Sequence, residues 1–185
     1  MHSEETSTTP NWYTKARSRA FAKQRPSTAN IPRIPLLIGT FFGAGLSPVA
    51  SGTMGSLAAV ALYVLIPGLR QPTALIVATL VIFIAGVWAS NIIERAINTH
   101  DPGMIVADEV AGQWLALTSA LFIGDPVFIG VAFLAFRFFD IVKLFPASLI
   151  ERRQGGFAVM ADDLIAGIYA NIVAHLVLIV LHQLA

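Results

Sequence analysis

The chain has 185 residues, of which 56% are apolar, only 12% are charged and none is cysteine, and its formal net charge is +1. Soluble domains carry about twice this share of charged residues, so the composition favours a membrane protein and excludes a disordered chain. The small net charge gives no case for nucleic-acid binding, and the lack of cysteine excludes disulfides, thiolate metal sites and a cysteine nucleophile.

The N-terminal segment, residues 1–33, differs from the rest of the chain. It carries six basic residues against two acidic ones, with polar residues and proline between them. Clustered lysine and arginine beside a membrane hold a segment on the cytoplasmic side. We therefore predict a disordered basic cytoplasmic arm over residues 1–33 and a membrane-embedded domain over residues 34–185.

Apolar runs separated by short polar breaks fill this predicted domain. They cover residues 53–66, 72–93, 102–123, 126–145 and 162–185. The second and fifth reach the roughly 20 residues that cross a hydrocarbon core, whereas residues 36–46 could span, re-enter or lie at the interface. The pattern predicts an all-α, polytopic integral membrane bundle of about five apolar helices plus a re-entrant or interfacial segment. Core helices of a soluble all-α protein are the alternative, which helices apolar on nearly every side disfavour.

The basic residues of the loops give the bundle an orientation. With the arm inside and the runs alternating, Arg95, Arg152 and Arg153 fall in inner loops and Arg70 falls in an outer loop, as the positive-inside rule requires. The same threading places six carboxylates near the inner face. They are Glu94, Asp108, Glu109, Asp140, Asp162 and Asp163. We therefore expect an acidic site near the cytoplasmic face.

These carboxylates are candidate ligands of a divalent cation. A carboxylate at mid-membrane costs roughly 2.5–3.5 kcal/mol and persists when it pairs, faces water or binds an ion. Oxygen ligands without cysteine favour Mg²⁺. The alternative is that they are ordinary helix-end residues, since Asp162 and Asp163 would suit the first turn of a helix.

Basic and hydroxyl side chains could complete a phosphate site. Arg137, Asp140 and Lys143 are spaced by three and share one arc of a helix, where an arginine fork and a lysine charge would suit a phosphate ester. A salt-bridge ladder within that helix is the alternative. The glycine-rich loop 39–56 could offer N–H donors to an anion or allow close helix packing. The candidate substrate-binding residues of this loop are Ser47, Thr53 and Ser56.

A second polar group lies at the inner end of the run 72–93. Asn91, Glu94 and Asn98 share one helix face, and His100 follows in an inner loop. Polar packing between helices explains the three helical residues equally well. His100 could be a base or a ligand.

Three stretches resemble the phosphatidylglycerophosphatase A family in order and spacing. They are GLSPVASGTMGS at 45–56, DPGMIVADEVAGQW at 101–114 and FRFFDIVKLFPASLIERRQGGFAVMADDLIAG at 136–167. The resemblance implies a multi-pass, Mg²⁺-dependent phosphatase of the cell inner membrane with its active site facing the cytoplasm. Its substrate would be phosphatidylglycerophosphate, and its products phosphatidylglycerol and inorganic phosphate.

The resemblance also implies roles for individual residues. The family's acidic motif falls on Asp108 and Glu109, and its FDxxK element falls on Asp140 and Lys143. Its GGxxVMxDD element supplies two glycines to the substrate site and two carboxylates to the metal site, namely Gly155, Gly156, Asp162 and Asp163. The expected Mg²⁺ ligands are therefore Asp108, Glu109, Asp140, Asp162 and Asp163, with Arg137 and Lys143 on the phosphate.

The sequence departs from the family pattern at three positions, and two other functions stay open. Ser51, Leu144 and Ala158 stand where the family commonly has proline, proline and glycine, which affects loop shape rather than the charged residues. A small cation-coupled transporter would also gather carboxylates, although nearer the midplane. A non-catalytic membrane assembly protein would explain the glycine-rich helices but not the carboxylates.

Overall fold

The computed structural model describes residues 28–145 and 155–184, and the regular elements in these ranges are helical. Most of the predicted arm, residues 1–27, lies outside the described residues, as do Arg152 and Arg153 of the loop 146–154. Within the described part of the arm, a short 3-10 helix, η1 (Thr28–Asn30), is followed by the buried Ile31. Ile31 packs in a small apolar cluster with Ile93 and Met104.

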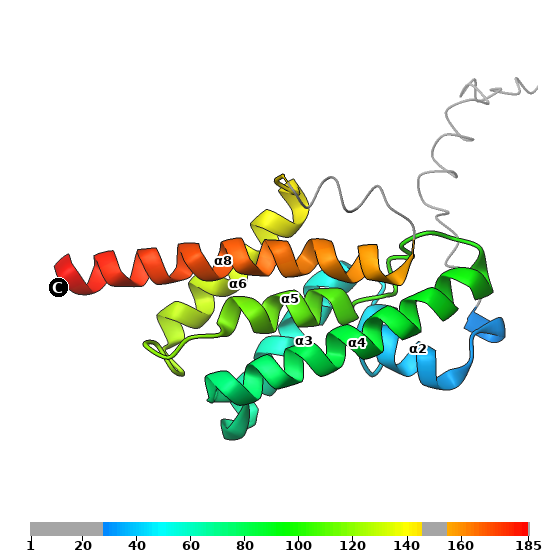
Figure 1. The fold of residues 1–185 in the computed structure, drawn as a ribbon, viewed down its shortest axis with the longest axis horizontal. Coiled ribbons are helices and arrows are strands. Elements are labelled where there is room, and N and C mark those ends of the chain that lie inside the picture. Colours follow the sequence, from blue (N-terminus) through cyan, green and yellow to red (C-terminus); the bar gives the residue numbers. More distant parts are fainter. Residues whose placement is uncertain (1–27, 146–154, 185) are drawn as a thin grey trace, which may run out of the picture.

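Six α-helices run in chain order through these ranges (Figure 1). They are α2 (Arg33–Gly39), α3 (Ser51–Leu65), α4 (Pro72–Ile97), α5 (Ala107–Leu117), α6 (Pro126–Val142) and α8 (Gly156–Leu184). Two further 3-10 helices, η2 (Ala44–Leu46) and η3 (Pro67–Arg70), join α2 to α3 and α3 to α4.

Local sequence sets several of these boundaries. Proline opens α4 and α6, where its missing N–H costs nothing. Asp125 caps α6, because its Oδ1 accepts hydrogen bonds from the backbone N–H groups of Val127 and Phe128 at 2.8 and 2.9 Å. Asn98 and Lys143 end α4 and α6 in the left-handed conformation, with φ of +49° and +48°.

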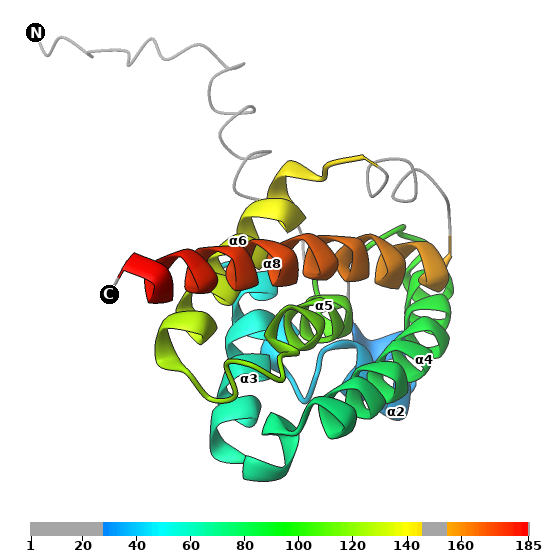
Figure 2. The ribbon, with the colours of Figure 1, turned by 60° about the vertical axis from the view of Figure 1, so that its left-hand side comes forward.

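Helix α5 lies at the centre of the bundle (Figure 2). It contacts α3, α4, α6 and α8, and its residues from Ala107 to Leu117 are buried except for two partly buried ones. The main apolar core forms around it. Its largest buried members include Tyr63, Leu75, Val110, Trp114, Phe128 and Phe136.

Glycine lets α5 and α8 meet backbone to backbone. A Cβ atom on Gly112 would lie 2.5 Å from the carbonyl oxygen of Asp163, and one on Gly167 would collide with the carbonyl oxygen of Gly112. Small residues at such crossings permit the closest approach of two helices. This crossing sets Asp163 of α8 beside the first turn of α5.

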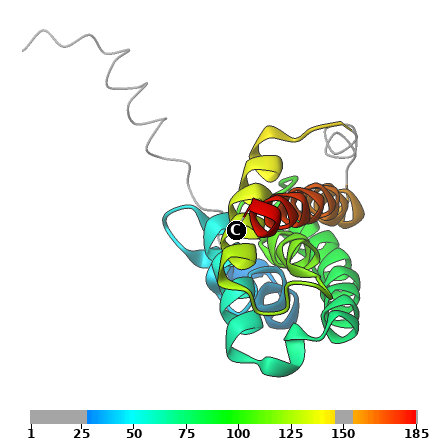
Figure 3. The same cartoon turned by 90° about the vertical axis from the view of Figure 1, so that its left-hand side faces the viewer.

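Two helices, α4 and α8, are long and apolar enough to cross a membrane. Only 28% of the most apolar window of each is buried, and large apolar side chains such as Ile84, Leu134 and Leu176 stay exposed. Seen from the C-terminal end of α8, both helices lie at the edge of the bundle (Figure 3). The described residues are all-α as expected, but two of their helices rather than five qualify as spans. Helix α5, with 11 residues, is about 16 Å long, too short for a hydrocarbon core of about 30 Å.

Several predicted boundaries are wrong. The run 102–123 is helical only over α5, because Val106 adopts a non-helical conformation before it and Thr118 is extended after it. The segment 36–46 is α-helical only up to Gly39 and ends in the 3-10 helix η2, and α6 ends at Val142. Helix α8 starts at Gly156, so Asp162 and Asp163 lie beyond its first turn, and the helix-dipole explanation for them fails.

Candidate functional site

Three carboxylates meet where α5 crosses α8. Asp108 and Glu109 occupy the first turn of α5, and Asp163 faces them from α8. One carboxylate oxygen from each residue lies within 4.8 Å of one from each of the others. Asp108 and Asp163 are only 7% and 4% exposed. We call Asp108, Glu109 and Asp163 the acidic cluster.

Burial and crowding disfavour negative charge in this cluster. Burial raises the pKa of Asp108 well above its usual range, and the charge of Glu109 and of Asp101 raises it further. The pKa of Glu109 is also raised, mainly by burial and then by the charge of Asp163, although Arg137 opposes the shift. Both groups lie on α5, which is not a candidate span. Carboxylates held together in this way are stabilised by a bound cation.

The donor set of the acidic cluster fits such a cation. All of its ligand atoms are carboxylate oxygens, which suit Mg²⁺ and other hard cations. The Oε2 atom of Glu109 is buried and has no hydrogen-bond partner among the described residues. A buried oxygen without a partner is costly unless something outside the chain satisfies it.

Two basic residues bind the neighbouring carboxylates. The Nη1 atom of Arg137 lies 2.8 Å from Oδ2 of Asp140 and donates a hydrogen bond of 3.3 Å to Oγ of Ser56. The ion pair within α6 is the one that the spacing predicted. The Nζ atom of Lys143 lies 2.9 Å from Oδ2 of Asp162 and so links the end of α6 to α8.

Gly52 of α3 leaves space between Glu109 and Arg137. A Cβ atom at this position would collide with Oε1 of Glu109 and lie 3.2 Å from Nη2 of Arg137. The Nε atom of Arg137 is buried and, like Oε2 of Glu109, has no hydrogen-bond partner in the described part of the chain. Of the two side chains that border Gly52, Glu109 therefore has an unused hydrogen-bond acceptor and Arg137 has an unused donor.

The other predicted substrate residues divide into two groups. Ser56 is fully buried and contacts Arg137, as described above. Ser47 instead donates to the carbonyl of Val49 in a local turn, and no described contact links Ser47 or Thr53 to the carboxylates. Gly155, with φ of +105°, precedes Gly156, whose backbone N–H donates to Oδ1 of Asn91 at 2.9 Å and so ties the start of α8 to α4.

Two residues near the cluster were missed by the sequence prediction. Gly52 borders Glu109 and Arg137, and the charge of Asp101 acts on Asp108. Asp101 has φ of +44°, a conformation that few non-glycine residues adopt. Both lie inside the stretches 45–56 and 101–114 that carry the family resemblance, so the motifs contained the signal.

Comparisons with known proteins agree with this resemblance. Residues 37–178 match the family described as phosphatidylglycerophosphatase A. A Bacteroides thetaiotaomicron protein provisionally named a phosphatidylinositol-3-phosphatase is 42% identical over 150 residues, which cover 75% of this chain and 90% of the relative. The phosphatidylglycerophosphatase A of Escherichia coli K12 is 37% identical over 153 residues, covering 82% of this chain and 86% of the relative. That of Haemophilus influenzae is 37% identical over 138 residues, covering 74% and 84%. No solved structure gives a significant match.

Proposed function

The chain belongs to the phosphatidylglycerophosphatase A family, and from this premise we propose that it removes the terminal phosphate of phosphatidylglycerophosphate to give phosphatidylglycerol and inorganic phosphate. The observation that carries the proposal is the meeting of the acidic cluster with Arg137 around Gly52. Carboxylates for a cation and a guanidinium for phosphate oxygens are the two components that hydrolysis of a phosphate monoester needs.

Asp108, Glu109 and Asp163 would hold one Mg²⁺ ion, with Asp140 and Asp162 as further candidate ligands. When bound, the ion neutralises phosphate charge and lowers the pKa of coordinated water. Asp140 and Asp162 are also the partners of Arg137 and Lys143. These ion pairs hold the two cations near the acidic cluster before substrate arrives.

Arg137 and Ser56 would position the phosphate group. The guanidinium is fixed by Asp140 and by Ser56, and its buried Nε–H remains available as a donor. An arginine fork binds phosphate oxygens with defined geometry, so the ester is oriented for attack by water on the side opposite the leaving alcohol. Hydrolysis takes a proton from the attacking water and delivers one to the departing alkoxide. The carboxylates of the cluster are the proton acceptors at this site.

We propose that the protein is a multi-pass protein of the cell inner membrane with this site facing the cytoplasm. The apolar helices α4 and α8 support membrane insertion. The cluster lies at the starts of α5 and α8, which is the end where α4 finishes with Arg95 in its last turn. Carboxylates at one end of the bundle suit a substrate whose headgroup lies at the membrane surface. They suit less well the midplane site of a transporter.

Phosphate release from a panel of lipids tests the proposed substrate. Purified protein with Mg²⁺ is offered phosphatidylglycerophosphate, phosphatidylinositol 3-phosphate and soluble glycerol 3-phosphate. We expect the largest kcat/KM for phosphatidylglycerophosphate. A larger value for the inositol lipid would reassign the headgroup, and release from none of the three by folded protein would contradict a phosphatase.

A further inference from the structure

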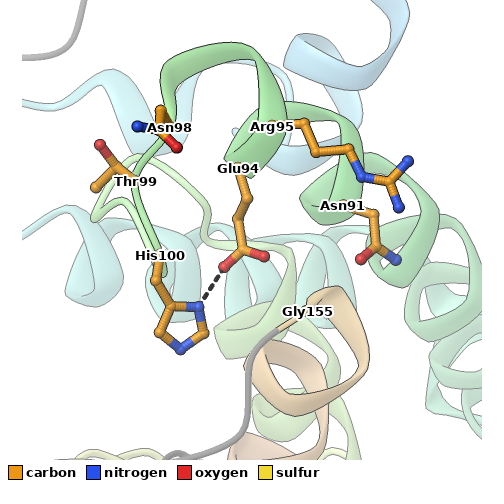
Figure 4. Close-up of a pocket in the computed structure, with 7 residues that line it drawn as sticks. All are labelled: Asn91, Glu94, Arg95, Asn98, Thr99, His100 and Gly155. Atoms are coloured by element: carbon orange, nitrogen blue, oxygen red, sulfur yellow. Dashed lines mark hydrogen bonds and ion pairs between the residues drawn. The ribbon is translucent and has the colours of Figure 1, made fainter.

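A polar cavity of about 420 Å³ lies at the inner end of α4, apart from the acidic cluster (Figure 4). Figure 4 shows Glu94 at its centre, with Asn91 and Arg95 on one side, Thr99 and His100 on the other, and Gly155 below. Ligand sites in proteins typically enclose about 300–1,000 Å³. Apart from Gly155, every lining residue has a polar or charged side chain, namely Asn91, Glu94, Arg95, Asn98, Thr99 and His100.

Hydrogen bonds fix the wall of this cavity. The Oε1 atom of Glu94 accepts from Nδ1 of His100 at 2.6 Å and from the backbone N–H of Asp101 at 2.9 Å. Asn91 donates to the carbonyl of Val87 and accepts from the N–H of Gly156. The bond from Gly156 joins α4 to the start of α8, so the cavity is bounded by a helix that also carries Asp163 of the acidic cluster.

The lining of the cavity carries one carboxylate and one guanidinium, those of Glu94 and Arg95. The charge of Glu94 is already engaged by His100 and by the N–H of Asp101. The exposed side chain of Arg95, by contrast, forms no ion pair or hydrogen bond with any residue in the ranges 28–145 and 155–184. A guanidinium without a protein partner at the edge of a polar cavity is suited to bind a phosphate group through two parallel hydrogen bonds.

The loop 98–101 connects this cavity to the acidic cluster. Asp101 is held by Glu94 through its backbone, and its own charge acts on Asp108. A ligand bound beside Glu94 and Arg95 would therefore be a near neighbour of a phosphate bound at the cluster.

We propose that this cavity is a second phosphate site, with Arg95 as its charged ligand. This proposal rests on the proposed function, and under that function the phosphate group has two sources. It is either the phosphodiester that links the lipid headgroup to diacylglycerol, or the inorganic phosphate that leaves after hydrolysis.

Direct binding to the full chain in detergent micelles tests this site. Calorimetric titrations are made in EDTA, because phosphate then has no metal ion at the acidic cluster to bind to. The probes are inorganic phosphate and glycerophosphoglycerol, a soluble phosphodiester. We expect saturable binding of one probe, weakened about tenfold or more in Arg95→Gln, since a charge-assisted pair is lost. Arg70→Gln, a change in a half-buried arginine of η3 before the opposite end of α4, should bind as wild type does.

The two probes, together with steady-state kinetics of Arg95→Gln, distinguish the two sources of the phosphate group. Binding of glycerophosphoglycerol identifies the lipid headgroup as the source and predicts a raised KM with unchanged kcat in Arg95→Gln. Binding of inorganic phosphate identifies the product and predicts weaker inhibition by added phosphate. Binding of neither probe, or equal binding by folded Arg95→Gln and wild type, would overturn the proposal. Because titration needs no turnover, it decides the matter even if the chain releases no phosphate from any lipid.

Discussion

Gly52 is the smallest residue of the candidate site and gives its most local test. In Gly52→Ala the new methyl group would displace the carboxylate of Glu109 and crowd Arg137. Displacing the end of a flexible side chain leaves the fold intact, whereas misplacing a catalytic group by about 1 Å can lower the rate about 100-fold. We therefore expect kcat/KM to fall about 10- to 100-fold while the unfolding temperature does not fall.

Gly130→Ala is the matched control for this substitution. Gly130 also lies within a helix, α6, and a Cβ atom there would meet nothing within 4 Å. Its activity should equal that of wild type. Full activity in Gly52→Ala would show that the space beside Glu109 plays no part in the reaction.

The Asp163→Asn variant tests metal binding through the stability of the protein rather than through its catalytic rate. Removing its negative charge relieves repulsion in the cation-free cluster, so Asp163→Asn should be at least as stable as wild type in EDTA. With Mg²⁺ at about 100 times its Kd, wild type should gain about 2.7 kcal/mol and the variant much less. The order of unfolding temperatures therefore reverses between EDTA and Mg²⁺.

Asp125→Asn supplies the control for the metal prediction. Asp125 caps α6, and asparagine caps helices equally well. This variant should gain as much stability from Mg²⁺ as wild type does. Identical gains in Asp163→Asn and wild type would exclude Asp163 from the metal site.

At this scale, the sequence could predict which side chains carry charge but not all of their partners. The pair of Arg137 with Asp140 follows from the i, i+3 spacing within one helix. The contact of Lys143 with Asp162 depends on how the end of α6 approaches α8, which no local pattern encodes. Gly52 has no chemistry of its own, so its place beside Glu109 becomes visible only once α3 and α5 are packed.

Between elements, the crossing of α5 and α8 determines whether the acidic cluster forms. In Gly167→Ala the new methyl group would meet the backbone of Gly112, which cannot move aside as a side chain can. Alanine gains about 1 kcal/mol of helix propensity over glycine, but overpacking costs about 1–3 kcal/mol. We expect a lower unfolding temperature and lower activity, whereas Gly130→Ala should lose neither. An unchanged melting curve for Gly167→Ala would show that the two backbones do not touch.

Hydrophobic runs predicted where the helices occur better than where they end. The runs 72–93 and 126–145 start where α4 and α6 start, at proline, although α4 continues to Ile97 and α6 ends at Val142. The run 102–123 is longer than α5, because the residues of the run on either side of α5 are not α-helical. The run 162–185 underestimates α8, because residues 156–161 lie outside the run, whereas Gly156 begins the helix and donates its N–H to Asn91 of α4.

For the whole molecule, the proposed topology can be tested with single cysteines, because the chain has none of its own. Thr99 and Ala120 are both exposed and lie at opposite ends of α5. In intact bacterial cells, a membrane-impermeant maleimide should label Ala120→Cys but not Thr99→Cys, and both should react after lysis. The reverse pattern would place the acidic cluster on the outer side.

Composition predicts a membrane protein, and two described helices, α4 and α8, are long and apolar enough to cross one, but the number of spans depends on geometry. A chain this apolar leaves large side chains exposed in any packing of its helices, as α4 and α8 show. Whether a shorter run spans depends on whether it faces lipid or other helices, and α5 is enclosed by its neighbours.

The most direct test of the central claim is phosphate release from phosphatidylglycerophosphate in micelles by wild type and Asp163→Asn, each with Mg²⁺ and with EDTA. Wild type with Mg²⁺ should release phosphate, and each of the other three conditions should lower the rate at least about 100-fold, as loss of a metal or its ligand does. Undiminished release in EDTA, or by folded Asp163→Asn with Mg²⁺, would contradict a metal-dependent phosphatase built on Asp108, Glu109 and Asp163.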